Sequence, residues 1–190
     1  MTKGRLEAFS DGVIAIIITI MVLEIKAPHA STIESLNEIL PQLFSYILSF
    51  MFVLIYWNNH HHLFQAVKVV NGRVLLANGL LLFSLSLIPF FTSWMGENHF
   101  APMPVMFYGI NGLVCGVSYN ILSSNLIKAQ GKDSDLALAV GNNKKENIST
   151  ISYITGVVFA SFYPYISCAL YLLISIMWLI PDKRIEKTIV

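Results

Sequence analysis

Charged residues are scarce in this chain, and their scarcity excludes an ordinary soluble domain. Of its 190 residues, 12% are Asp, Glu, Lys or Arg and 55% are hydrophobic, and the mean hydropathy is +0.65. Soluble domains carry about 25% charged residues. Cysteine is also rare. Cys115 and Cys168 each lie inside an apolar segment, so no disulfide framework is indicated. The composition predicts a protein whose main surroundings are a lipid bilayer.

The motifs of common enzyme and cofactor sites are missing as well. The sequence has no Walker loop, no dinucleotide-binding glycine pattern, no Cys/His pair at zinc spacing and no nucleophile elbow. The one tempting cluster is "WNNHHHLF", which contains His60, His61 and His62. Consecutive residues on a helix point about 100° apart, so these three imidazoles cannot converge on one metal ion. We therefore expect no enzyme activity, no cofactor, no structural metal site and no nucleic-acid partner.

Long apolar runs are what the sequence does contain, and they predict six membrane-spanning helices of about 20 residues each. The expected spans are Leu6–Ile25, Ile39–His61, Val74–Met95, Met103–Ile127 and two that share Ile148–Ile180. Pro164 disfavours helix at the residue before it, so we place a hairpin near Tyr163–Pro164 and expect the sharp breaks near span ends. The predicted fold class is an all-α membrane protein, with residues 1–190 forming one six-helix transmembrane domain.

Basic residues are distributed unevenly between the two sides that six spans define. Both termini lie on one side, and eleven basic residues fall there, against Lys26 alone on the other. The eleven are Lys3, Arg5, Lys68, Arg73, Lys128, Lys132, Lys144, Lys145, Lys183, Arg184 and Lys187. Cytoplasmic loops carry the excess of Lys and Arg. We therefore expect a multi-pass protein of the cell membrane with both termini in the cytoplasm.

Three polar residues stand at the start of the first span, where charge is costly. A charge in lipid costs roughly 2.5–3.5 kcal/mol on insertion scales, so Arg5, Ser10 and Asp11 require partners on neighbouring helices. The candidate partners are His60, Asn71, Arg73 and Asn78. This apolar segment lacks the small-residue cleavage site of a secretory signal, so we expect it in the mature protein.

The rest of the first span carries a continuous stripe of mostly apolar side chains. Gly12, Ile16, Thr19, Ile20 and Leu23 recur at helical spacing on one face. Asp11 points about 140° away from Ile16, so the acid and the stripe face different surroundings. Periodicity alone leaves three surroundings open for the stripe: lipid, the protein core or a pore.

Three segments resemble one known family. Arg5, Phe9, Ser10, Asp11 and Gly12 form an "RxxxFSDG" signature. "YWNNHHHLF" and "NGLLLFSLSLIPF" continue the similarity in the second and third spans. The sequence resembles the lysosomal potassium channel transmembrane protein 175 and its prokaryotic relatives, in the single-repeat form with six spans. The similarity covers the whole chain, although the last three spans agree only in length and hydropathy.

This resemblance implies a homotetramer whose four first helices line a central pathway for potassium and other monovalent cations. Carried over by position, Ile16 forms the narrowest ring and Leu23 lies two turns further out. Either Thr19 or Ile20 forms the ring between Ile16 and Leu23. The polar residues Arg5, Ser10, Asp11 and His60 are expected to form the network that fixes the pore helix against its neighbours.

The mechanism that follows differs from that of the usual potassium filter. No "TVGYG" segment is present, and the carbonyls of a helical pore are already used in helix hydrogen bonds. A ring of isoleucines forces partial dehydration, so we expect a modest preference for potassium over sodium and a possible passage for protons. Two alternatives remain: a secondary transporter, which needs a midplane binding site, and a non-conducting membrane scaffold.

Overall fold

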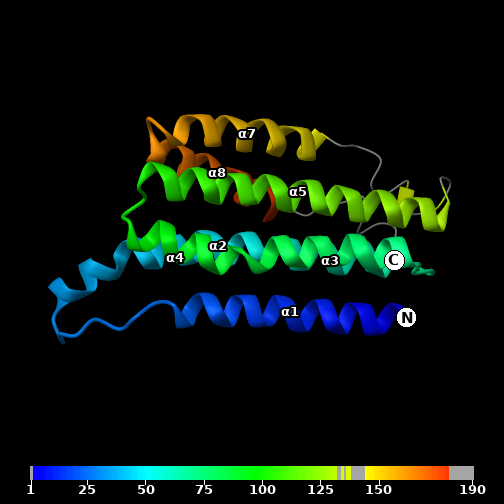
Figure 1. Cartoon of the computed structure of the whole chain (residues 1–190), viewed down its shortest axis with the longest axis horizontal. Coiled ribbons are helices and arrows are strands. Elements are labelled where there is room, and N and C mark those ends of the chain that lie inside the picture. The colour runs from blue at the N-terminus through cyan, green and yellow to red at the C-terminus, as the bar shows by residue number, and fades with distance from the viewer. Residues whose placement is uncertain (1, 132–133, 135, 138–143, 180–190) are drawn as a thin grey trace.

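The computed structural model describes residues 2–131, 134, 136–137 and 144–179, and their regular structure is entirely α-helical. The helices run side by side along one direction (Figure 1). They are α1 (Lys3–Leu23), α2 (Ile33–Gln65), α3 (Gly72–Ser86), α4 (Ile88–Glu97), α5 (Pro102–Gln130), α7 (Lys144–Ala160) and α8 (Pro164–Leu179). Four stretches are long and apolar enough to cross a membrane: α1, α2, α5, and α3 with α4 taken together. When α3 and α4 are counted as one stretch, the described residues form six long helical segments, the number that the sequence predicts. The remaining two are α7 and the shorter apolar α8.

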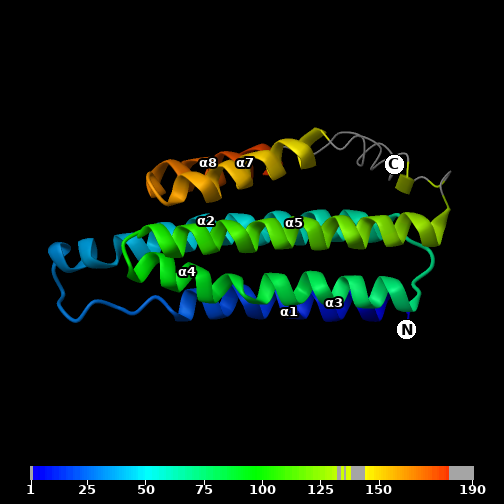
Figure 2. The same ribbon diagram turned by 45° about the horizontal axis from the view of Figure 1, so that its top comes forward.

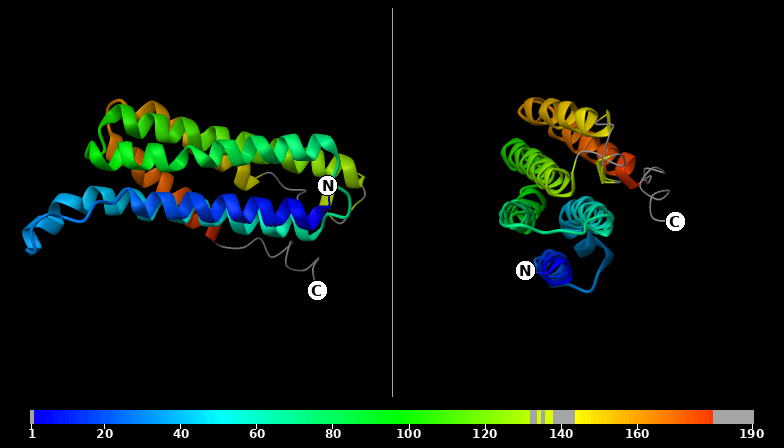
Figure 3. Two further views of the ribbon diagram at one scale, coloured as in Figure 1. Left: turned by 60° about the horizontal axis from the view of Figure 1, so that its bottom comes forward. Right: turned by 90° about the vertical axis from the view of Figure 1, so that its right-hand side faces the viewer.

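Helix α1 lies at one edge of the bundle. It packs against α2, α3 and α4, whereas α5 packs against α3, α4, α7 and α8. Figure 2 shows the bundle from the side, with α1 and α7 on opposite sides of it, and the right-hand panel of Figure 3 looks along the helices, with α2 and α3 next to α1. One face of α1 is therefore covered by its own chain and the rest is left outward.

Regular helix is interrupted for one residue inside the third span. Regular helix stops at Ser86 and resumes at Ile88, with Leu87 between them. Pro89 follows at the start of α4, and proline lacks the amide hydrogen that would continue the helix ladder. Leu87 keeps a right-handed helical conformation, with φ −83° and ψ −13°. The two segments consequently still act as one stretch, Gly72–Glu97.

The last two helices form the predicted hairpin. Helix α7 ends at Ala160 and α8 begins at Pro164, so the predicted turn near Tyr163–Pro164 is confirmed. The Tyr163 N–H donates to the Phe159 carbonyl at 2.7 Å, which closes the end of α7. Helix α7 starts at Lys144, earlier than the expected Ile148, while the expected end of the last span at Ile180 lies outside the described residues.

Several described basic residues lie at the end of the bundle where α1 and α3 begin and α2 and α5 end. Lys3 Nζ donates to the Gln65 carbonyl at 3.2 Å, which joins the start of α1 to the end of α2. The Lys68 N–H donates to Gln130 Oε1 at 3.0 Å, which joins the α2–α3 connection to the end of α5. Lys26 follows α1 at the opposite end (Figure 1). Lys132, Lys183, Arg184 and Lys187 lie outside the described residues, and the cytoplasmic location of this end stays a prediction.

Two glycines one turn apart on α5 have different surroundings. A Cβ added at Gly112 would lie 2.6 Å from Tyr153 Cε1, so this glycine permits the close approach of α5 and α7. A Cβ added at Gly116 would meet only Tyr56 Oη, at 3.8 Å. Gly112 is therefore a packing position, whereas Gly116 borders open space.

We expect Gly112→Ala to destabilise the protein and Gly116→Ala to be neutral or slightly stabilising. The first substitution pushes against a buried ring, and overpacking typically costs about 1–3 kcal/mol. The second gains helix propensity, worth roughly 0.8–1.0 kcal/mol for glycine to alanine, at no steric cost. Thermal unfolding of both purified variants in the same detergent measures the difference. Equal losses of stability would contradict the packing role of Gly112.

Candidate functional site

Two faces of α1 meet different environments. Its buried residues are Leu6, Ser10, Ile14, Ile17 and Met21, which face α2, α3 and α4. The predicted stripe lies about 140° around the helix from this buried face. Ile16 is 59% exposed and Leu23 is 73% exposed. The core of its own chain is thus excluded as the surroundings of the stripe, which leaves lipid or another copy of the chain.

The single hydroxyl of the stripe is oriented by its own helix. Thr19 is exposed, and its Oγ1 donates to the Ala15 carbonyl at 2.9 Å. This bond uses the hydroxyl hydrogen, so the oxygen lone pairs remain available to water or to a cation. Gly12 and Ile20 are exposed as well, and Thr19 and Ile20 lie on either side of the line from Ile16 to Leu23.

A buried chain of hydrogen bonds connects three helices behind the stripe. His60 Nε2 of α2 lies 2.8 Å from Asn78 Oδ1 of α3, and Asn78 Nδ2 donates to Ser10 Oγ of α1 at 3.0 Å. The Ser10 hydroxyl in turn donates to the Leu6 carbonyl at 2.9 Å. An amide oxygen can only accept, so His60 carries its proton on Nε2. All three side chains are at most 1% exposed. We name Ser10, His60 and Asn78 the polar clasp.

The other two predicted members of the polar network lie apart from this clasp. Asp11 is exposed, and its Oδ1 accepts a hydrogen bond from Trp57 Nε1 of α2 at 3.0 Å. Arg5 is exposed, with no hydrogen bond or ion pair to another side chain in the described part of the chain. The four predicted residues therefore do not form one network. Ser10 and His60 are buried and linked through Asn78, whereas Asp11 bonds to Trp57 and Arg5 points outward. Their shared role in fixing the pore helix stays a prediction.

Sequence reasoning identified some of the residues that complete these contacts and missed others. Asn78 was one of four candidate partners, and Asn71 serves instead as the N-cap of α3, accepting from the Val74 N–H at 3.0 Å. Trp57 was assigned to the family pattern, yet its indole supplies the donor for Asp11. The sequence did carry a signal for the Trp57 contact. Trp57 lies three residues before His60, and residues at i and i+3 share a helix face, so both side chains are expected to face α1.

We expect Asp11→Ala and Trp57→Phe to lower stability by similar, modest amounts. A hydrogen bond to a charged group contributes about 1.5–3 kcal/mol when buried, and this one is exposed, so a smaller loss follows. The double variant should lose little more than either single one, because all three remove the same bond. Melting temperatures in detergent test this, and fully additive losses would show that the two side chains act separately.

The histidine cluster does not assemble a metal site in the part of the chain that the structure describes. No group of three or more His, Cys, Asp or Glu side chains converges there. Gln65 Nε2 donates to His61 Nε2 at 2.8 Å, and His62 Nδ1 lies 3.4 Å from Gln65 Oε1. Two of the three imidazoles therefore meet an amide one turn further along the helix.

Comparison with known proteins places this arrangement in one family. The family model described as endosomal/lysosomal potassium channel TMEM175 matches residues 5–89, which contain the stripe, the clasp and the Asp11–Trp57 contact. A protein of a Chryseobacterium species, named as a potassium channel, is 56% identical over 189 residues. That match covers 100% of this chain and 98% of the relative. The chain belongs to the TMEM175 family.

Other members of the TMEM175 family show how far the similarity extends. A Chamaesiphon minutus protein named as a potassium channel is 41% identical over 100 residues, 50% of this chain and 49% of that protein. The crystal structure of a lysosomal potassium-selective channel TMEM175 homolog from Chamaesiphon minutus aligns with a TM-score of 0.80 and 27% identity. It covers 93% of this chain and 96% of the other. The chicken endosomal/lysosomal proton channel TMEM175 is 26% identical over 121 residues, 61% of this chain and 24% of that protein. This TMEM175 homologue is accordingly a multi-pass membrane protein.

Proposed function

We propose that this TMEM175 homologue is a potassium-permeable cation channel with a hydrophobic constriction built by α1. The observation that carries the proposal is the outward, mostly apolar stripe on an edge helix whose opposite face is buried. The relatives named as potassium channels support the same reading. One α1 helix cannot enclose a pathway by itself, so the proposal requires several copies around an axis, and we infer four.

In this proposal Ile16 forms the narrowest ring. An isoleucine side chain offers no oxygen to replace hydration water, so a ring of them either excludes water or forces ions to lose part of their hydration shell. Potassium holds its water less tightly than sodium, and a modest potassium preference follows. The outward oxygen of Thr19 lies about one turn further along and supplies a ring of weak acceptors next to the constriction.

The polar clasp gives such a pore its rigidity. A constriction keeps its diameter only if the helix that carries it cannot rotate or slide. Ser10 is buried one and a half turns before Ile16 and is held by Asn78, which His60 holds in turn. Buried polar groups of this kind are costly to separate, because each then loses its hydrogen-bond partner. In this proposal the buried Ser10 of α1 has a structural role, and the stripe has the permeation role.

Proton passage is a second activity that one observation favours. The chicken and mouse relatives are named proton channels. A transient file of water through a narrow apolar ring conducts protons without a titratable group in the constriction. We therefore propose proton permeation through the same α1 pathway, measured separately from potassium current.

Planar-bilayer recording of the purified protein under opposed potassium and sodium gradients tests the proposal. The expected result is a current whose reversal potential lies closer to the equilibrium potential of potassium than to that of sodium. The current should also scale with the number of inserted channels. Flux that saturates and moves protons in fixed stoichiometry would indicate a secondary transporter instead. Absence of current under every gradient would indicate a scaffold. Native mass spectrometry of the same sample is expected to show four chains.

A further inference from the structure

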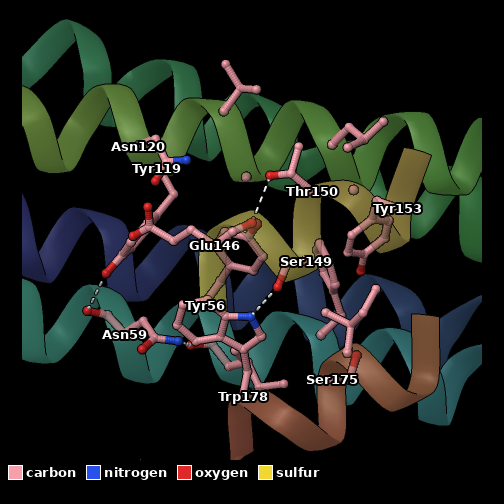
Figure 4. Close-up of a pocket in the computed structure, with 17 residues that line it drawn as sticks. Tyr56, Asn59, Tyr119, Asn120, Glu146, Ser149, Thr150, Tyr153, Ser175 and Trp178 are labelled. Atoms are coloured by element: carbon pink, nitrogen blue, oxygen red, sulfur yellow. Dashed lines mark hydrogen bonds between the residues drawn. The ribbon is translucent and has the colours of Figure 1, made fainter. Parts of the chain in front are cut away.

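A cavity lies between α2, α5, α7 and α8, on the side of the bundle away from α1 (Figure 4). Its volume is about 90 Å³, enough for several water molecules or a small organic group. Aromatic side chains form much of its wall: Phe52, Tyr56, Tyr119, Tyr153 and Trp178. Gly116 borders the same space, which explains why a Cβ there meets so little. The cavity combines apolar walls with a few polar groups.

One carboxylate in this cavity lacks a partner. Glu146, in the first turn of α7, is partly buried, and burial raises the pKa of its carboxyl above the usual value. Its side chain points toward Tyr119 and Asn120 (Figure 4). Among the residues that the structure describes, none forms a hydrogen bond or ion pair with this carboxylate. A partly desolvated acid gains free energy when a cation or donor reaches it.

Three of the donors that line the cavity are already used within its wall. Trp178 Nε1 donates to Ser149 Oγ at 2.8 Å, and Tyr119 Oη donates to the Asn59 carbonyl at 3.3 Å. The Thr150 hydroxyl donates to the backbone carbonyl of Glu146 at 2.9 Å, not to its carboxylate. The carboxylate therefore remains the strongest unmatched polar group in an aromatic space, and its charge selects a positive ligand over a negative one.

The cavity is separate from the proposed ion pathway. The residues of α2 that line it are Phe52, Ile55, Tyr56 and Asn59, whereas Trp57 and His60 contact the α1 and α3 side. These two sets point about 120° apart around α2. A ligand in the cavity would thus touch neither the stripe nor the polar clasp, and the inference does not depend on the proposed channel function.

We propose that this cavity binds a small amphiphilic organic cation, an arylalkyl amine whose ammonium group pairs with Glu146 and whose apolar body packs against Tyr56 and Tyr153. Aromatic rings attract cations at their faces as well as apolar groups, so the wall suits both ends of such a ligand. Lys145 Nζ already lies 5.6 Å from the centre of the Trp178 ring, which shows that a cation is accommodated at this rim.

Equilibrium dialysis with 4-phenylbutylammonium tests the site on the full chain in nanodiscs, with empty nanodiscs as the partition control. The expected result is saturable binding of one molecule per chain. 5-Phenylpentanoate, an anion of matched size, should show only the binding seen in empty nanodiscs. Glu146→Gln should weaken binding of the cation at least tenfold, while the matched variant Glu38→Gln, an exposed acid far from the cavity, should bind as the unmodified chain does.

A second variant separates loss of the site from loss of the fold. Gly116→Leu places a side chain into the open space beside Tyr56 and should abolish saturable binding while the melting temperature stays within a few degrees. Three results would each overturn the proposal: cation binding no greater than in empty nanodiscs, equal binding by Glu146→Gln, or saturable binding of the anion. Loss of ion conduction would not affect it, because the assay measures binding alone.

Discussion

Ile16→Asn is expected to raise single-channel conductance and to reduce the preference for potassium over sodium. Ile16 is 59% exposed on the outward stripe of α1, so the substitution leaves the core of the chain unchanged. An amide at the constriction supplies a donor and an acceptor to passing water and ions, which lowers the cost of entering the ring. Lowering a barrier by about 0.7 kcal/mol changes a rate roughly threefold, and we expect at least that increase.

The matched control for this substitution is Val22→Asn. Val22 lies on the same helix, is 46% exposed, and points about 120° away from Ile16. It receives the same polar group outside the proposed pathway, so its conductance and reversal potential should stay close to those of the unmodified channel. Single-channel recordings of both variants under mixed potassium and sodium gradients make the comparison. Unchanged currents in Ile16→Asn, or equal changes in both variants, would remove Ile16 from the constriction.

Asn78→Leu is expected to cause the largest loss of stability among single substitutions in the clasp. Leucine has the same branched outline as asparagine and a somewhat larger volume, but it satisfies neither Ser10 Oγ nor His60 Nε2, and both side chains are buried. Leaving a buried polar group without its partner costs about 1–3 kcal/mol, and here two lose theirs. In a chain of this size 1 kcal/mol shifts the melting temperature by roughly 2–4 °C, so a decrease of about 5 °C or more follows.

Asn125→Leu provides the control for Asn78→Leu. Asn125 is on α5, and its side-chain amide only donates to the Ile121 carbonyl of its own helix, at 2.8 Å. Its loss should change the melting temperature little. A Ser10→Ala variant combined with Asn78→Leu should be less destabilised than the sum of the two single variants, since they share one hydrogen bond. A melting temperature for Asn78→Leu equal to that of Asn125→Leu would argue against a clasp.

The number and order of the long helical segments could be predicted from the sequence, because an apolar run of about 20 residues in a membrane protein usually forms one spanning helix. The Pro164 turn followed from local chemistry in the same way. The interruption at Leu87 was not predicted. Pro89 lies inside a continuous apolar run, and such a run reads as one unbroken span. The early start of α7 was missed because its first residues, beginning at Lys144, are polar and do not extend the apolar pattern.

The candidate site could be predicted only in part. Helical periodicity gives the angle between Asp11 and Ile16, but it does not say which side packs on a neighbour, because packing depends on how α1 is rotated against α2 and α3. Asn71, Arg73 and Asn78 were equal candidates in sequence, and only the tertiary arrangement separates a helix cap from a clasp residue. The cavity around Glu146 draws on segments far apart in the chain and has no local signature.

The division of α1 into two faces has a consequence for how such proteins diversify. Residues that hold the helix and residues that point outward lie on different faces of α1, so most substitutions in the outward set leave the packing of the buried set unchanged. In the proposed channel, evolution can thus replace one outward position after another, altering which ions pass and how fast, while the packing that supports α1 is inherited intact.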